Sequence, residues 1–454
     1  MSNSLSTSSP GIAAEGNPAS DTLVTSGNRL ELLSLAAIIA LSGGLLNEHL
    51  RIGGESGRGL NQIILLPLFA VCAMMTLHRA SRSVRIVLRS PLTALLFAVP
   101  VASIFWSIDP LHSASRSLAF ILAVATAALI ADRLSVRDLL LMTALGVGIM
   151  AMLNFLYSLA LPGIGIMQEG HVGAWRGLYS QKNGLARLMV LGTIACSMAA
   201  FELRGRYRLL SGAGALLCLA LVVLSTSKTA LVALFAVAAA VGFVHLLRAR
   251  GMLLILTALL AVSAVAAAFL MVALFAEDGA AMLGRDLSLS GRTIVWSASV
   301  VELAARPIFG FGYGAFWTGW DGPGAMVWAQ VGWDPGDSHN GFLDAALDFG
   351  VAGSAILVVH VTVMTLAAIR WARSSSESPL WPIAFLVFFV IYNLTESSTF
   401  RPTNVLWVLY PMVSLQLASG LASASRRTSK PLDSSEHAIR RGIGKSENSA
   451  KSIT

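Results

Sequence analysis

Charged residues are scarce in this chain of 454 residues, and their scarcity excludes a soluble domain as its main body. Lys, Arg, Asp and Glu together make up 12% of the sequence, whereas soluble domains carry about 25%. Hydrophobic residues make up 55%, and the mean hydropathy is +0.72. The composition therefore predicts an all-α polytopic integral membrane protein.

Cysteine is also scarce, with Cys72, Cys196 and Cys218 alone in the whole sequence. Each of the three lies in an apolar run, and none has a neighbour at the short spacing of metal ligands. This pattern excludes both a disulfide framework and a metal site of the cysteine type. We expect the three thiols to be packing residues.

Residues 1–28 have no apolar periodicity and no basic cluster ahead of the first apolar run, so they do not resemble a signal peptide. We predict that they and residues 422–454 are disordered cytoplasmic tails around a membrane domain at 29–421. The net charge of +8 comes from Lys and Arg clusters between apolar runs. Such clusters set membrane topology, so no nucleic-acid partner is expected.

Apolar runs long enough to cross a hydrocarbon core of about 30 Å predict about 12 transmembrane helices. They cover residues 30–46, 60–77, 91–106, 117–131, 139–161, 185–201, 209–224, 229–247, 252–275, 345–369, 381–394 and 404–421. Arginine concentrates in alternate loops, at 79–89, 133–137, 204–208, 248–250 and 370–373. Both termini are therefore expected in the cytoplasm, with one long extracytoplasmic segment, 276–344, between spans 9 and 10.

The long segment 276–344 carries the residues best suited to chemistry. His339 and Asn340 stand just before span 10, where a helix N-terminus favours an anion. A histidine there can act as a general base, because its ordinary pKa of about 6.5 lies close to working pH. The alternative role for His339 is a capping or surface residue.

Arg292 and Trp296 lie four residues apart in a sequence that predicts a helix ending at Arg306-Pro307. Their spacing places both side chains on one helix face. The alternative interpretation is an arginine that reaches for the membrane interface beside a belt tryptophan.

Further cations are predicted at the same outer face. Arg176, Lys182 and Asn183 precede span 6, and Lys228 precedes span 8. Solvated cations are common at a membrane boundary, but several that converge opposite a histidine would suit a diphosphate. We predict that at least two of the four cations at 176, 182, 228 and 292 bind phosphate.

These motifs, in this order, resemble the O-antigen ligase and polysaccharide polymerase (Wzy-C) superfamily, most closely its ExoQ-like exopolysaccharide polymerase branch. The motifs are Arg176-Gly177 with Lys182-Asn183-Gly184, Ser225 to Thr229, Gly291-Arg292-Thr293 with Trp296, Arg306-Pro307 with Gly310-Phe311-Gly312, and His339-Asn340 with Gly350. The likeness covers roughly residues 91–410. Many relatives have arginine at the position of Lys228, so this position departs from the family pattern.

The resemblance implies a glycosyltransferase of the bacterial cytoplasmic (inner) membrane with a periplasmic active site, needing no metal or other cofactor. It implies an undecaprenyl-diphosphate-linked glycan as donor, a lipid-linked glycan or lipid A core as acceptor, contact with membrane lipids, and a chain-length regulator as a possible partner. His339 then assists the attacking hydroxyl, and Arg292 with Lys228 meets the diphosphate. Arg176, Lys182, Asn183, Asn340 and Trp296 are the other residues expected to bind substrate.

Three functions remain open at this point. A polymerase of lipid-linked repeat units is favoured, and a ligase that moves finished polymer to lipid A core or protein shares its donor. A transporter would need ionisable residues along a path through the membrane. The predicted span centres carry almost none, which argues against transport.

Overall fold

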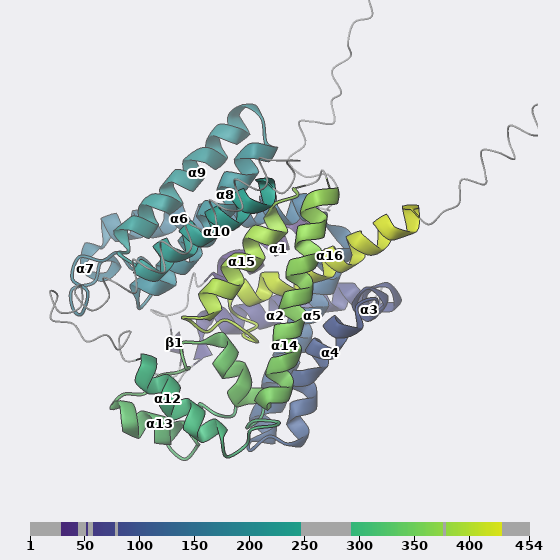
Figure 1. The fold of residues 1–454 in the computed structure, drawn as a ribbon. Helices are drawn as coiled ribbons and strands as arrows, with labels where there is room; N and C mark the ends of the chain where they lie inside the picture. Colours follow the sequence, from purple (N-terminus) through teal and green to yellow (C-terminus); the bar gives the residue numbers. More distant parts are fainter. Residues whose placement is uncertain are drawn as a thin grey trace, which may run out of the picture.

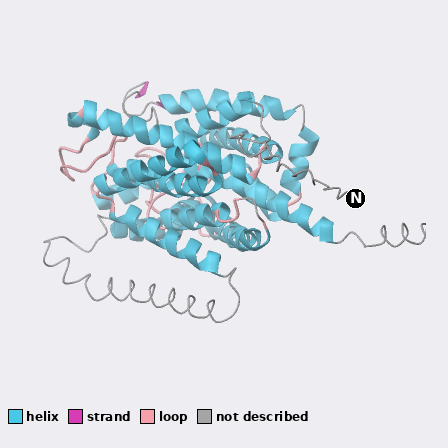
Figure 2. Cartoon of the chain, turned by 90° about the horizontal axis from the view of Figure 1, so that it is seen from above, coloured by secondary structure: helices cyan, strands magenta, loops and turns pink. Residues whose placement is uncertain are grey.

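The structure is a computed structural model that describes residues 29–43, 51–52, 58–77, 80–246, 292–375 and 378–428. Helices dominate it in both views of the chain (Figures 1 and 2). The predicted tail 1–28, predicted span 252–275 and residues 276–291 of the long segment lie outside the described residues, as does most of the tail 422–454.

The elements follow one another along the chain with a single pair of two-residue strands among the described residues. They are α1 (Arg29–Ser42), β1 (Arg51–Ile52), β2 (Arg58–Gly59), α2 (Leu60–Leu77), α3 (Ala80–Leu88), α4 (Pro91–Ala102), η2 (Ser103–Phe105), α5 (Pro110–Arg133), α6 (Val136–Ala160), α7 (Pro162–Gly165), α8 (Lys182–Glu202), α9 (Gly205–Leu224), α10 (Lys228–Leu246), α12 (Arg292–Leu303), α13 (Gly324–Val331), α14 (Gly341–Ser374), α15 (Trp381–Asn393) and α16 (Val405–Thr428). β1 and β2 pair antiparallel.

Six of the described helices, α5, α6, α8, α9, α10 and α14, are long and apolar enough to cross a membrane. The pair Ser81–Leu88 and Pro91–Phe105, bent by 104°, can form a seventh span. Every predicted run except 252–275, which is not described, overlaps a helix. The chain is therefore a multi-pass membrane protein, and the count of twelve spans stays a prediction.

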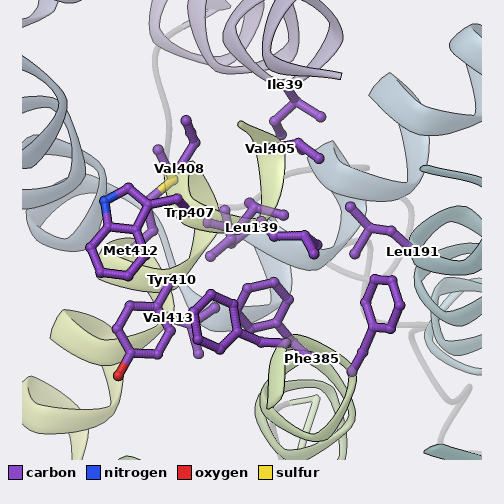
Figure 3. Packing of buried hydrophobic residues seen from close by; sticks show 14 of the residues in the cluster. Ile39, Leu139, Leu191, Phe385, Val405, Trp407, Val408, Tyr410, Met412 and Val413 are labelled. Carbon is purple, nitrogen blue, oxygen red and sulfur yellow. The ribbon is translucent and has the colours of Figure 1, made fainter. Parts of the chain in front are cut away.

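Aromatic side chains of α15 and α16 form the centre of the core (Figure 3). Phe389 and Tyr410 stack with ring centroids 4.4 Å apart, and Trp407 stacks on Tyr410 at 5.2 Å. Large aromatic rings bury more apolar surface than any other side chains, so they hold these two helices firmly. The loop between α15 and α16 is consequently anchored at both ends.

Asn393, the last residue of α15, folds that loop back on itself. Its side-chain oxygen accepts hydrogen bonds from the backbone N–H groups of Ser398 and Thr399, at 2.9 and 3.2 Å. The loop also packs tightly on the start of α14, where a Cβ added to Gly341 would lie 2.2 Å from the side-chain oxygen of Asn393. These contacts fix the loop against the N-terminus of α14.

α14 is broken at Gly350, whose φ of 65° and ψ of −169° are not helical. The segment after α12 fills the break, because the N–H groups of Phe311 and Gly312 donate to the carbonyls of Leu347 and Asp348 at 2.8 and 2.9 Å. The glycine-punctuated stretch 310–314 belongs to this segment. It provides hydrogen-bond donors for the carbonyls of Leu347 and Asp348, which would be bonded within the helix if α14 were unbroken.

Replacing Gly350 with Ala is expected to destabilise the protein. The φ and ψ at this position are essentially restricted to glycine, and a Cβ would lie 2.2 Å from the backbone of Ile308. The cost is about 2 kcal/mol or more of unfolding free energy. Thermal unfolding of the purified protein in detergent measures it. Gly242→Ala in α10 is the control, because among the described residues no atom outside the helix's own backbone lies within 4 Å of the added Cβ, and it should leave the midpoint equal or higher.

Candidate active site

The carboxylate of Glu396, in the loop between α15 and α16, is the centre of the site. Nη2 of Arg292, the first residue of α12, lies 2.5 Å from Oε1. The side-chain amide of Asn183, in the first turn of α8, donates to the same oxygen at 3.1 Å. Nδ1 of His339, just before α14, lies 3.5 Å from Oε2. Three predicted site residues from separate elements thus meet on one carboxylate.

This cluster is largely withdrawn from solvent. The side chains of Arg292 and Glu396 are 15% and 14% exposed, and that of His339 is 26% exposed. The backbone N–H of Gly341 donates to the carbonyl of Glu396 at 3.1 Å, so the loop is bonded to the start of α14. Charge-assisted contacts in such a partly shielded place are stronger than in open water.

His339 sits in a left-handed backbone conformation, with a φ of 53°. Its N–H donates to Oδ1 of Asp337 at 2.9 Å, and its ring Nδ1 lies 3.5 Å from the same oxygen. Nδ1 therefore faces two carboxylates, those of Asp337 and Glu396. This arrangement leaves Nε2 as the ring nitrogen that can meet a substrate.

Asn340 caps α14, since its side-chain oxygen accepts from the backbone N–H groups of Phe342 and Leu343 at 3.0 and 3.2 Å. The prediction that a helix begins directly after His339-Asn340 is confirmed. The cap occupies the first backbone donors of the helix, which were expected to be available to an anion. The structure thus gives Asn340 a positioning role beside His339.

The neighbouring charges decide the protonation of His339. The nearby carboxylate of Glu396 raises the pKa of His339 and outweighs burial, which lowers it, and the charge of Asp337 raises it further. For Asp337, burial raises the pKa, but Arg401 and His339 together hold it below the usual range. Arg401 places Nη1 3.0 Å from Oδ2 of Asp337. The imidazolium form of His339 is thus stabilised by a carboxylate that stays ionised.

Trp296 ties α12 to the histidine loop. Its indole Nε1–H donates to the carbonyl of Ser338 at 2.8 Å. The indole N–H is therefore satisfied inside the protein, and Trp296 holds the helix that carries Arg292 against the residue preceding His339. In Figure 1, α12 and α13 lie together at the end of the bundle where α14 begins.

The motifs that carry Lys182 and Lys228 are bonded to each other. Lys182 donates to the carbonyl and hydroxyl of Thr226, each at 3.4 Å, and the hydroxyl of Ser227 donates to Asn183 at 3.1 Å. The motifs around residues 182 and 228 are thus joined, and Lys228 is exposed as the first residue of α10.

Arg176 is bound within its own loop. Its Nε donates to the carbonyl of Ile164 at 2.7 Å, and its Nη1 donates to that of Ser180 at 3.1 Å. Among the described residues, the hydrogen-bond partners of this guanidinium do not include Glu396 or His339. A role for Arg176 in phosphate binding stays a prediction.

Glu396, Asp337 and Arg401 were not among the predicted site residues. The signal that indicates two of them is the run Thr395 to Arg401, polar except for Phe400, which lies between the last two apolar runs on the predicted outer face. Seven consecutive residues without an aliphatic side chain are more than a short turn needs. Asp337 is two residues before His339, and the sequence alone gives no distance between the two side chains.

Two comparisons with known proteins bear on this site. The O-antigen ligase family model matches residues 213–358, which include Lys228, Arg292, Trp296, His339 and Asn340. The chain is also 25% identical over 99 residues to the exopolysaccharide production protein ExoQ of Rhizobium meliloti (strain 1021). That alignment covers 21% of this chain and 23% of ExoQ. Over its matched segment the chain is similar to the O-antigen ligase family, and the resemblance predicted from its motifs is confirmed.

Proposed function

We propose that this protein is a membrane glycosyltransferase that polymerises undecaprenyl-diphosphate-linked oligosaccharide repeat units into exopolysaccharide at the periplasmic face. The observation that carries the proposal is the meeting of Arg292, Asn183 and His339 on the carboxylate of Glu396. A cation, an amide and a base at one shielded point are what a transfer from a diphosphate requires.

In the proposed reaction, an acceptor sugar hydroxyl attacks the anomeric carbon of the donor. The new bond joins the acceptor oxygen to that carbon, and the bond from the carbon to the diphosphate oxygen breaks. Nε2 of His339 takes the hydroxyl proton. Because Nδ1 faces Asp337 and Glu396, the imidazolium that forms is stabilised, as it is in a Ser-His-Asp triad.

Arg292 meets the departing diphosphate. A guanidinium has five N–H donors in a planar fork, and the ion pair with Glu396 engages Nη2. The remaining donors can bind phosphate oxygens as negative charge develops on them. Lys182 at the start of α8 and Lys228 at the start of α10 supply further positive charge. The two helix starts are linked by the hydrogen bonds of Thr226 with Lys182 and of Ser227 with Asn183.

Replacing Glu396 with Gln is expected to move the acidic limb of the rate–pH profile to lower pH. A base works in its neutral form, so the rate falls as pH falls through the pKa of His339. Glu396 is the largest cause that raises this pKa above the ordinary value of about 6.5. Steady-state rates measured across pH test this shift, and Glu169→Gln, an exposed carboxylate, is the control. An unmoved limb in Glu396→Gln would exclude His339 as the titrating base.

The proposed function is tested by the lipid-linked glycan pool of a deletion strain with and without the wild-type gene. A polymerase predicts single repeat units on the carrier and no polymer when the protein is absent. The matched family's description as an O-antigen ligase favours one alternative, a transfer of finished polymer to lipid A core or protein. Long polymer that stays on the carrier and is missing from its final acceptor would establish that ligase instead. A pool and polymer profile that do not change would overturn both.

A further inference from the structure

A cavity of about 510 Å³ lies next to the Glu396 cluster and shares Arg401 with its surroundings. It opens between the start of α5, the loop after Gly314, the first turns of α14 and the end of the α15–α16 loop. Its lining includes Asp109, Arg116, Trp317, Asp344, Asp348 and Arg401. The site described above uses one of these side chains, that of Arg401, which is paired with Asp337.

Arg401 joins the cavity to His339. Its Nη2 lies 3.4 Å from Oδ2 of Asp344 in the lining, and its Nη1 lies 3.0 Å from Asp337, which in turn contacts His339. The contacts therefore run from Arg292 through Glu396, His339 and Asp337 to Arg401. His339 thus lies between the cation assigned to the leaving group and this cavity along one chain of contacts.

The lining can accept and donate hydrogen bonds at once. Oδ1 of Asp348 accepts a hydrogen bond from the backbone N–H of Gly314 at 2.9 Å. Oδ1 of Asp109 accepts one from the backbone N–H of His112 at 3.0 Å. The other carboxylate oxygen of each residue can accept a hydrogen bond from a ligand. Among the described residues, Nε of Arg116 has no hydrogen-bond partner, and the guanidinium lies over the ring of Tyr313. Trp317 adds an indole surface.

This balance of groups selects the class of ligand. Three carboxylates face two guanidinium groups in the set named above, and this excess of acidic groups disfavours a diphosphate. Among the described residues, no group of three His, Cys, Asp or Glu side chains is arranged to hold a metal ion. Hydroxyl groups both donate to carboxylates and accept from guanidinium, and sugar rings present an apolar face to an indole.

We infer that this cavity binds a sugar residue of the acceptor glycan and delivers its hydroxyl to His339. The inference rests on the proposed function and assigns a subsite to it. Asp109, Asp348 and Arg116 hold the sugar hydroxyls, and Trp317 packs on a ring face. Donor and acceptor then approach His339 from opposite ends of one chain of contacts.

The test uses the purified full-length protein in detergent and the repeat-unit oligosaccharide released from its carrier by mild acid, which carries no diphosphate. Thermal midpoints are measured against oligosaccharide concentration for wild type, Asp109→Asn and the control Glu169→Gln. Asn caps a helix as well as Asp does, so the variant keeps the hydrogen bond that begins α5. We expect the half-saturating concentration to rise about tenfold in Asp109→Asn and to stay unchanged in Glu169→Gln.

Kinetics with lipid-linked substrates provide the second measurement. Asp109→Asn is expected to raise the acceptor KM more than the donor KM, while Arg292→Lys raises the donor KM more. The subsite is overturned if the oligosaccharide does not stabilise wild type, or if it stabilises wild type and Asp109→Asn equally. This holds even if wild type elongates lipid-linked units. Failure of wild type to elongate them overturns the proposed function instead, whatever the oligosaccharide does.

Discussion

Polymer synthesis is expected to fall by about 10²- to 10⁴-fold when His339 is replaced by Ala, with the protein at wild-type abundance in the membrane. This range is the usual contribution of a positioned acid–base group. Nδ1 of His339 lies 3.5 Å from both Asp337 and Glu396, so an alanine removes the imidazole that accepts the proton and leaves both carboxylates without this neighbour. Repeat units should then accumulate on the carrier.

His171→Ala is the matched control for that experiment. His171 is an exposed histidine in the loop before α8, and its replacement should leave both the polymer and the carrier pool at wild-type levels. The measurement is the polymer profile together with the lipid-linked pool in the complemented deletion strain. A normal profile from His339→Ala would remove this histidine from the mechanism.

Arg292→Ala is expected to lower the rate of transfer by about 10²- to 10³-fold, the range for loss of one donor that stabilises a developing negative charge. Arg292→Lys should recover only part of the rate, because an ammonium keeps the charge and loses the planar fork of donors. The matched control is Arg206→Ala, an exposed arginine in the first turn of α9, close in sequence to the end of α8 opposite to Asn183. It should retain the wild-type rate.

A double variant separates the two roles that Arg292 can have. If Arg292 served only to neutralise Glu396, removing both charges in Arg292→Ala with Glu396→Gln would restore the rate. If it binds the diphosphate, the double variant stays as slow as Arg292→Ala or slower. Initial rates with purified lipid-linked donor make this comparison, and recovery of activity in the double variant would contradict the assignment of Arg292 to the leaving group.

The local parts of the site were predictable from the sequence. The run of apolar positions before Arg306-Pro307 predicts α12, and the change from polar to apolar residues after His339-Asn340 predicts the start of α14. Both depend on residues close together in the chain, where helix periodicity and capping act. The placement of Arg292 near His339 was expected from the orientation of the loops, but their common partner was not.

Glu396 shows why the rest was not predictable. It lies 104 residues from Arg292 and 213 residues from Asn183 along the chain, and no periodicity relates positions so far apart. Its location follows from the packing of α15 and α16, whose rings stack in the core, and from the loop that Asn393 folds. Likewise, nothing in the sequence indicates that Arg401 would connect Asp337, beside His339, to a cavity at the start of α5.

The sequence by itself determined that this is a helical membrane protein and which residues stand at the ends of its helices. It could do so because burial of apolar runs in hydrocarbon and the capping of helices are decided over stretches of about 20 residues or fewer. The tertiary structure alone decided which of those ends meet, since it is the packing of distant helices that brings Arg292, Asn183 and His339 to Glu396. The direction of the His339 pKa shift is a consequence of that meeting.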